Sequence, residues 1–149
     1  MPLADEPPGE SRRRIHVSPV VFEPELGRAL VVDDDRDFAT ELAQRMNDFG
    51  LVACVESDAE AALRRLFGEA EYRMLICDHH KAGLTGPHLI RRIKTTLREP
   101  PTCVLVTGQA SFGFAWNALR CGADDFISKP LDPDELEHAI VRHTRGLRV

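Results

Sequence analysis

The sequence predicts an α/β domain, a (βα)₅ chain that folds into a doubly wound sheet of five parallel strands. Three observations lead to this fold class. Short apolar runs alternate with runs of helical period from Arg28 onward. Crossovers between parallel strands have a fixed hand, which places helices on both faces of the sheet. Polar residues follow several strands directly, at the edge where such sheets bind ligands.

The first strand and helix are expected within residues 28–50. Residues 29–32 are an apolar run typical of a buried strand. In the helix that follows, apolar side chains recur at helical spacing until Gly50 ends it. These side chains are Phe38, Leu42, Met46 and Phe49.

The second and third strands, residues 51–55 and 74–77, enclose the next helix. Ser57 and Glu60 form the pattern of a capping box ahead of it. Its apolar positions are Ala62, Leu63 and Leu66. A third helix begins at Pro87, and its apolar positions are Leu89, Ile90, Ile93 and Leu97.

The fourth strand is expected over residues 103–106, and a helix opens at Ser111 and runs to Gly122. Residues 126–127 mark the fifth strand. The last helix has a cap residue, a proline in its first turn and an acid three residues after the cap. These are Asp132, Pro133 and Glu135.

The composition is that of an ordinary globular chain, with a distinct stretch at the start. Hydrophobic residues make up 43% and the net charge is -5, so we expect no direct binding to nucleic acid. Half of the ten prolines fall in residues 1–27, which predicts a partly disordered extension before a domain over 28–146. The first residues lack the apolar core of a signal peptide and no apolar run has the length of a membrane span, so we expect a cytoplasmic protein without membrane contact.

The cysteines are expected to be reduced thiols. None of them forms a C-x-x-C pair. Free cysteine behaves as a small core hydrophobe, which favours burial of all four. They are Cys54, Cys77, Cys103 and Cys121.

Polar groups follow four of the predicted strands. They are Asp33, Asp34 and Asp35 after the first, Asp78 after the third, Thr107 after the fourth and Lys129 after the fifth. Carboxylates crowded at one edge repel each other. Mg²⁺ relieves this cost and commonly bridges carboxylates to a phosphate. For the acidic triplet alone, the alternative is a helix cap with solvated acids that suit the positive end of the helix dipole.

Asp78 is the predicted nucleophile. A carboxylate oxygen can attack a phosphoryl group and form an acyl phosphate. Lys129 supplies an ammonium group that neutralises the transferring oxygens, and Thr107 can donate its hydroxyl to them. The sequence therefore predicts a phosphoryl acceptor that works with Mg²⁺.

Four segments resemble the CheY-like receiver domain of two-component response regulators. They are LVVDDDRDF, MLICDHHKAGLTG, VLVTGQAS and GADDFISKPLDPDEL, in the family's order and over about residues 28–145. The resemblance implies the flavodoxin-like strand order 2-1-3-4-5 and Mg²⁺ as the cofactor. It also implies a phosphorylation-dependent switch rather than an enzyme, since such a domain catalyses only its own phosphorylation and dephosphorylation.

By this resemblance Asp78 is the phosphoacceptor. Asp33 and Asp34 are the acidic pair, and they hold Mg²⁺ together with Asp78 and the backbone carbonyl of His80. Gly86, eight residues after Asp78, is the glycine that ends the phosphoacceptor loop.

The resemblance also assigns the residues that sense the phosphoryl group. Thr107 is the switch hydroxyl, Lys129 is the phosphate-binding lysine, and the Lys129–Pro130 peptide bond is cis. Phe126 stands at the aromatic switch position, three residues before the lysine.

Four residues depart from the family's usual pattern. Lys81 and Ala82 replace Met-Pro after the phosphoacceptor, which loosens the loop and adds a cation near the site. Gly108 replaces the common alanine, and Phe126 replaces tyrosine and so lacks a hydroxyl. An alternative is therefore a degenerate receiver that binds its partners without phosphorylation.

The upstream partner implied by the resemblance is a histidine kinase or a histidine phosphotransfer protein. The chain ends soon after its last helix, so we expect either a stand-alone receiver that signals through protein contacts or the receiver piece of a longer protein. A downstream target or a homodimer partner would bind the helix over residues 111–121 and the strand after it. That helix is expected to be apolar on two faces, one of them formed by Phe112, Trp116 and Leu119, so that one face would be left exposed for docking. The alternative is that loops or the N-terminal segment bury both faces.

Two other readings use the same acids. Asp33-x-Asp35 resembles the start of a haloacid-dehalogenase-like phosphatase, with Asp33 as nucleophile and Asp35 as acid/base, but Asp37 departs from that motif. His79 and His80 beside Asp78 could bind a transition metal. Consecutive residues at a strand end rarely point at one ion, so we expect these histidines instead to control the access of water or a kinase to Asp78.

Overall fold

The computed structural model describes residues 26–68, 70–78, 85–108 and 120–144. Its strands form one sheet in the order β2-β1-β3-β4-β5, and every pairing is parallel. This confirms the predicted doubly wound sheet and its 2-1-3-4-5 order. The strands are β1 (Gly27–Val32), β2 (Leu51–Glu56), β3 (Met74–Asp78), β4 (Thr102–Thr107) and β5 (Asp125–Ser128).

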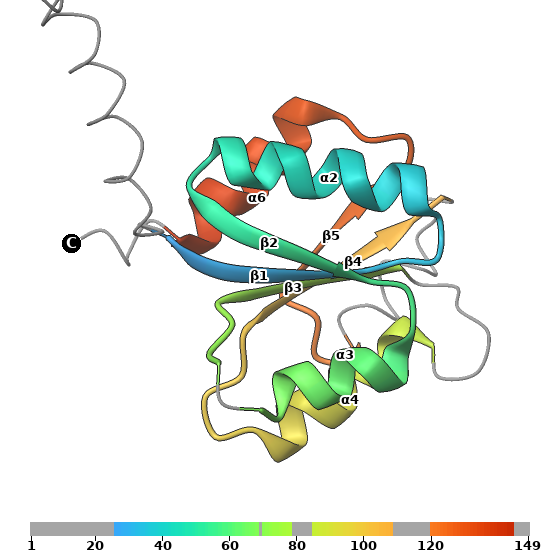
Figure 1. Ribbon diagram of the computed structural model, residues 1–149, viewed down its shortest axis with the longest axis vertical. Coiled ribbons are helices and arrows are strands. Elements are labelled where there is room, and N and C mark those ends of the chain that lie inside the picture. The colour runs from blue at the N-terminus through green and yellow to red at the C-terminus, as the bar shows by residue number, and fades with distance from the viewer. Residues whose placement is uncertain (1–25, 69, 79–84, 109–119, 145–149) are drawn as a thin grey trace, which may run out of the picture.

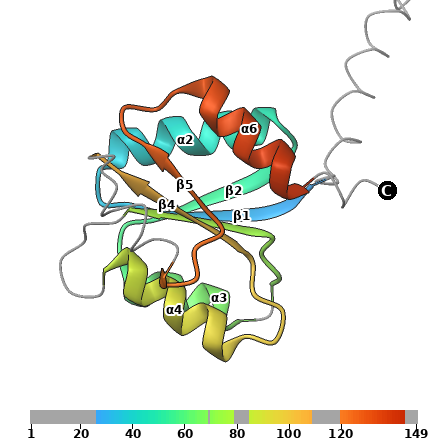
Figure 2. The ribbon, with the colours of Figure 1, turned by 180° about the vertical axis from the view of Figure 1, so that it is seen from behind.

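Helices cover both faces of the sheet. Helices α2 and α6 lie on one face, and α3 and α4 lie on the other (Figures 1 and 2). Within the described residues, no helix has the length and apolar character needed to cross a membrane. The helices are α2 (Arg36–Asp48), α3 (Ala59–Leu66), α4 (Gly86–Thr96) and α6 (Pro133–Thr144).

The sheet separates two apolar cores. Val31 of β1 lies in the core under α2 and α6, while its neighbours Leu30 and Val32 lie in the core under α3 and α4. Successive side chains of a strand point to opposite faces, so a run without polar residues supplies both cores at once. The central strands are thereby fixed from two sides, which holds the residues at their ends in place.

The cap of α3 differs from the prediction. Asp58 is the N-cap, and its side chain accepts a hydrogen bond from the Glu60 N–H at 3.1 Å. The helix begins at Ala59, one residue later than a cap at Ser57 requires, so Glu60 is its second residue rather than its third. The predicted cap position at Ser57 is therefore wrong by one residue, and the helix itself is confirmed.

The other helix boundaries agree closely with the sequence. Gly50 follows α2 with φ 106°, the left-handed conformation that ends many helices. Thr85 caps α4, which starts at Gly86, one residue before the predicted Pro87. Asp132 accepts a hydrogen bond from the Asp134 N–H at 3.0 Å and caps α6 as predicted.

Three of the four thiols are buried as expected. Cys77, Cys103 and Cys121 lie in the core under α3 and α4, whereas Cys54 is half-buried on the outer strand β2. Several other predictions lie outside the described residues. They concern the extension before residue 26, the segment with His79, His80, Lys81 and Ala82, and the predicted helix with Phe112, Trp116 and Leu119.

Candidate functional site

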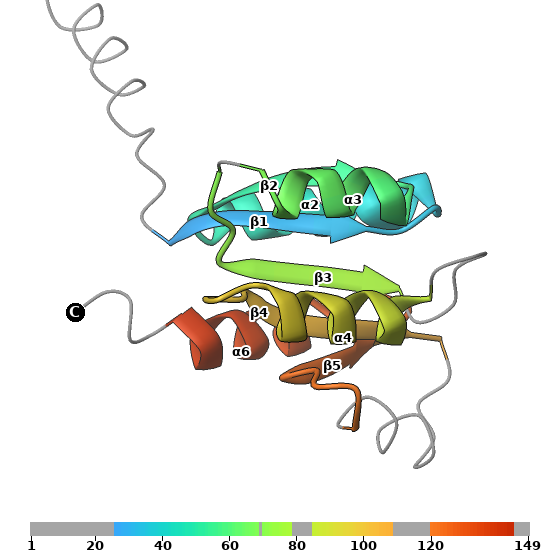
Figure 3. The same cartoon turned by 90° about the horizontal axis from the view of Figure 1, so that it is seen from below.

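Three aspartates meet where β1 and β3 end. Asp33 directly follows β1, and Asp78 is the last residue of β3. The pairing of Val32 with Cys77 places both ends at the same level, on the edge seen in Figure 3. One carboxylate oxygen from each of Asp33, Asp34 and Asp78 lies within 4.8 Å of the others. Asp33 and Asp78 are buried, with 2% and 8% of their surface exposed, and Asp34 is exposed.

Lys129 reaches this acidic cluster from the end of β5, the strand at the edge of the sheet. Its Nζ lies 3.1 Å from Asp33 Oδ2 and 3.8 Å from Asp78 Oδ2. The lysine directly follows β5, and its backbone N–H donates to the Thr107 carbonyl at 2.9 Å. The Lys129–Pro130 peptide bond is cis. The register of β4 and β5 thus brings the ammonium group to the acids.

The lysine is held in its charged form. Burial lowers the pKa of Lys129, but the contact with Asp33 and the negative charges of Asp33, Asp78 and Asp35 outweigh this and raise the pKa above its ordinary value. The ammonium group therefore keeps its charge across the physiological range, as a group that neutralises phosphoryl oxygens must.

Thr107 ends β4 at the same edge. Asp78 pairs with Val106, so Thr107 is the next residue along and lies beside the end of β3. It is buried, with 3% of its surface exposed. Gly108 follows, and a Cβ built there would meet no atom of the described residues within 4 Å. The structure thus brings the four predicted groups Asp33, Asp78, Thr107 and Lys129 to one edge.

Gly86 allows the start of α4 to approach the end of β3 closely. A Cβ at this position would lie 2.3 Å from the Asp78 carbonyl oxygen and 2.9 Å from Leu105 Cδ2. Atoms do not approach so closely, so any other residue forces the helix away from the strand. The glycine that the resemblance singled out therefore has a steric reason in this chain.

The donor set fits a hard cation. Asp33 Oδ1 accepts the Asp35 N–H at 2.9 Å, whereas Oδ2 is buried and has no hydrogen-bond partner among the described residues. Its contact with Lys129 Nζ is an ion pair without hydrogen-bond geometry. A buried carboxylate oxygen left in this way carries a desolvation cost. Mg²⁺ prefers carboxylate oxygens of this kind and would offset that cost.

Asp35 has a different role from the other acids of the triplet. It is the N-cap of α2, and its side chain accepts the Phe38 N–H at 3.1 Å. The capping interpretation of the triplet therefore holds for Asp35, while Asp33 lies in the acidic cluster. The phosphatase alternative needs Asp35 as an acid/base, and nothing in this arrangement favours it.

Two further residues complete the surroundings. Phe126, the predicted switch residue, is half-buried and packs against the core under α3 and α4. Phe38 has its ring centroid 4.6 Å from Lys129 Nζ. The sequence marked Phe38 only as an apolar helix position, because helical spacing gives the face of a side chain and not its partner. His80 lies outside the described residues.

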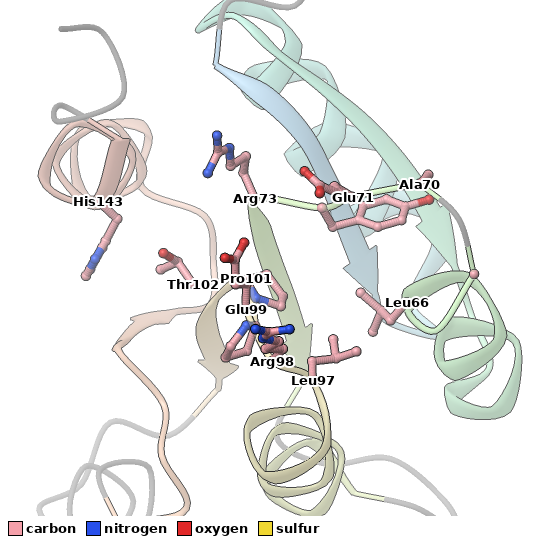
Figure 4. Close-up of a pocket in the computed structure, with 13 residues that line it drawn as sticks. Leu66, Ala70, Glu71, Arg73, Leu97, Arg98, Glu99, Pro101, Thr102 and His143 are labelled. Atoms are coloured by element: carbon pink, nitrogen blue, oxygen red, sulfur yellow. The ribbon is translucent and has the colours of Figure 1, made fainter.

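A cavity of about 700 Å³ opens at the opposite edge of the sheet (Figure 4). Its lining includes Arg73, just before β3, and Thr102, the first residue of β4. The acidic cluster lies where these strands end, so the cavity is a strand's length away from it. It takes no part in the chemistry of the acids.

Comparisons with known proteins agree with this geometry. A model of the response regulator receiver domain family matches residues 29–141, inside the domain predicted over 28–146. The chain is 31% identical over 119 residues to the transcriptional regulatory protein ZraR of Klebsiella oxytoca. This match covers 78% of this chain and 26% of ZraR. It is 30% identical over 122 residues to the two-component response regulator PhoP of Pseudomonas aeruginosa, and the match covers 80% of this chain and 53% of PhoP.

Solved structures of receiver domains have the same fold. The receiver domain of NtrX from Brucella abortus is 33% identical, with a TM-score of 0.71 and coverage of 78% of this chain and 98% of that one. A CheY-like receiver domain protein from Methanospirillum hungatei is 26% identical, with a TM-score of 0.72 and coverage of 82% and 96%. The chain spans between a quarter and about half of the curated relatives above. Since the family match covers most of the chain, the protein belongs to the response regulator receiver domain family.

Proposed function

We propose that this receiver domain is a phosphorylation-dependent switch that accepts a phosphoryl group on Asp78 with the help of Mg²⁺. The observation that carries the proposal is the position of Asp78. Its buried carboxylate lies within 4.8 Å of two further carboxylates and 3.8 Å from the Lys129 ammonium. Phosphorylation of an aspartate is general in this family, and the geometry supports Asp78 as that residue.

The phosphoryl donor in this proposal is a phosphohistidine of a histidine kinase or of a histidine phosphotransfer protein. An Asp78 carboxylate oxygen forms a bond to phosphorus as the P–N bond breaks, and the electron pair of that bond returns to the imidazole. Lys129 neutralises charge on the transferring oxygens, and Thr107 donates its hydroxyl to one of them. Asp78 is left as an acyl phosphate.

Asp33, Asp34 and Asp78 would hold Mg²⁺, together with the backbone carbonyl of His80. When bound, the ion neutralises the charge of the phosphoryl oxygens and of the acids. The buried Oδ2 of Asp33 supports this assignment, because no described residue donates a hydrogen bond to it and its ion pair with Lys129 leaves room for a second positive partner. The acids themselves orient the site.

Phosphorylation then changes the surface through Thr107 and Phe126. The new phosphoryl group attracts the Thr107 hydroxyl and Lys129, and the space left by Thr107 lets Phe126 repack. Phe126 is only half-buried on β5, which leaves room for such a change. The output is a protein contact, with a downstream target or with a second copy, at the segment over residues 111–121 and β5. We place this switch in the cytoplasm with its kinase.

The test is the intact mass of the protein after incubation with acetyl phosphate, with and without Mg²⁺. Wild type should gain one phosphoryl group that depends on Mg²⁺, and Asp78→Asn should gain none. Asp134→Asn, an exposed aspartate at the start of α6, is the matched control and should behave as wild type. An adduct that survives in Asp78→Asn and maps to Asp33 would refute the assignment. No adduct with either acetyl phosphate or a phosphorylated histidine phosphotransfer protein would favour the degenerate receiver.

A further inference from the structure

Phe38 is anchored next to the acidic cluster by its own backbone. It is the third residue of α2, and its N–H donates to Asp35 Oδ1 at 3.1 Å. The Asp35 N–H donates in turn to Asp33 Oδ1 at 2.9 Å. One short segment therefore fixes both a carboxylate of the cluster and the aromatic ring. Phe38 is 9% exposed and belongs to the core under α2 and α6, so its ring has little freedom to turn away.

The Lys129 ammonium lies close to both this ring and the acids. Its Nζ is 4.6 Å from the Phe38 ring centroid, 3.1 Å from Asp33 Oδ2 and 3.8 Å from Asp78 Oδ2. A cation this close to an aromatic face is attracted by the ring quadrupole. This attraction does not require a hydrogen bond, so it occupies none of the three N–H donors of the ammonium group, whereas a carboxylate or carbonyl would accept from one of them.

We propose that Phe38 is a positioning residue for Lys129, which holds the ammonium group at the cluster while leaving its donors for phosphoryl oxygens. A lysine side chain is a flexible stem with a strongly hydrated charge. The side chain of Lys129 is 23% exposed, so water competes for the ammonium group. The ring face limits this competition on the side of the ammonium group that it covers. The inference rests on the proposed function and concerns how its lysine is kept in place.

The test compares Phe38→Leu with Phe38→Tyr. Leucine keeps an apolar side chain but has no ring face, whereas tyrosine keeps the ring. With saturating Mg²⁺, we expect Phe38→Leu to be phosphorylated by acetyl phosphate about three- to tenfold more slowly than wild type. Its affinity for beryllofluoride, a mimic of the phosphoryl group, should fall by a similar factor in fluorine NMR. Phe38→Tyr should restore both to within about twofold.

A packing control separates the ring from general loss of core contacts. Leu42→Val changes a buried side chain one turn further along the same helix, in the same core. It should leave the phosphorylation rate of the folded protein unchanged. Urea unfolding and circular dichroism establish that each variant is folded under the assay conditions.

A double-mutant cycle tests whether Phe38 acts through the lysine. In a Lys129→Met background, Phe38→Leu should change the rate and the beryllofluoride affinity by less than about twofold, because the cation is gone. An equal slowing in both backgrounds would overturn the proposal and leave Phe38 as a packing residue. A Phe38→Leu rate equal to that of wild type would also overturn it. If wild type itself gains no phosphoryl group on Asp78, the proposed function fails instead, so the two failures are distinct.

Discussion

At the scale of single residues, the site depends on how closely the backbone can approach Asp78. Gly86 lies against the Asp78 carbonyl, and its missing Cβ is what lets α4 begin there. The same helix start comes at the end of the segment that follows Asp78. A side chain at residue 86 therefore disturbs packing and chemistry together, although the residue does not react.

Gly86→Ala should destabilise the protein by about 1–3 kcal/mol, because its Cβ overlaps the Asp78 carbonyl. This loss opposes a gain of up to about 1 kcal/mol in helix propensity. Urea unfolding gives the change in free energy. Gly108→Ala is the matched control, since its Cβ would meet nothing within 4 Å in the part of the chain that the structure describes. We expect it to change stability by less than about 1 kcal/mol. Equal effects of the two substitutions would contradict the steric account of Gly86.

The sequence predicts the site groups better than their neighbours. Asp33, Asp78, Thr107 and Lys129 could be found because the ends of parallel strands meet at one edge, whatever the details of packing. The position of the Phe38 ring over Lys129 could not, because a rotamer depends on the packing of several elements. The cap of α3 was misplaced by one residue, since Ser57 and Asp58 are both good caps and only the chain path chooses between them.

At the scale of elements, Asp125 ties α6 to the start of β5. Its Oδ2 accepts hydrogen bonds from Arg142 Nε at 3.1 Å, and His143 Nε2 lies 3.0 Å away. Burial raises the pKa of Asp125, but Arg142, the Phe126 N–H and His143 together lower the pKa below its ordinary value. The ionised carboxylate therefore contributes to stability, and protonation removes that contribution.

This tie predicts a pH dependence. Because the pKa of Asp125 is lower in the folded state, its contribution is present above the unfolded pKa and is lost as the pH falls through the folded value. Asp125→Asn should cost about 1 kcal/mol near neutral pH, and the difference from wild type should shrink below about pH 4. Urea unfolding of both proteins between neutral and acidic pH measures this difference in the free energy of unfolding.

Glu137→Gln provides the control for this titration. Glu137 is an exposed acid on the same helix, and its substitution should change stability by less than about 0.5 kcal/mol at any pH. A difference between Asp125→Asn and wild type that stays constant into acid would count against an ionic tie. It would indicate instead that the shape of the side chain matters.

The order of elements was the most predictable level of the molecule. Apolar runs and helical spacing indicated every strand and helix that the structure describes, because each run must bury itself against the sheet. The strand order came from the resemblance and not from the pattern. The spacing of the apolar residues does not tell which strands are neighbours. For example, β2 and β3 follow each other in the sequence, but β1 lies between them and pairs with both.

At the scale of the whole molecule, the sheet joins two cores into one folding unit. Every central strand supplies side chains to both cores, so neither can come apart without disturbing the other. Cooperative unfolding follows from this shared layer rather than from contacts between the helices of opposite faces. Single domains of this size usually unfold in one step.

Ile140→Val and Ile93→Val test this coupling from opposite faces. Ile140 of α6 lies in one core and Ile93 of α4 in the other, and both are almost fully buried. Each substitution should cost about 0.5–1.5 kcal/mol, and the costs should add in the double variant. Fluorescence and circular dichroism should report a single urea transition with an unchanged slope. A second transition in either variant would show that the two cores unfold separately.

Because the thiols are unevenly buried, the outer strand β2 can be labelled selectively through its cysteine, Cys54. Thiolates react with maleimides, and burial raises the pKa of Cys103 to about 12 and also raises that of Cys121. Cys77 is shielded in the same core, which leaves half-buried Cys54 as the thiol that a reagent reaches first in the folded protein. A dye attached there reports from the edge of the sheet beside β1 without any engineered cysteine. Slow modification of the other three then measures how often the core under α3 and α4 opens.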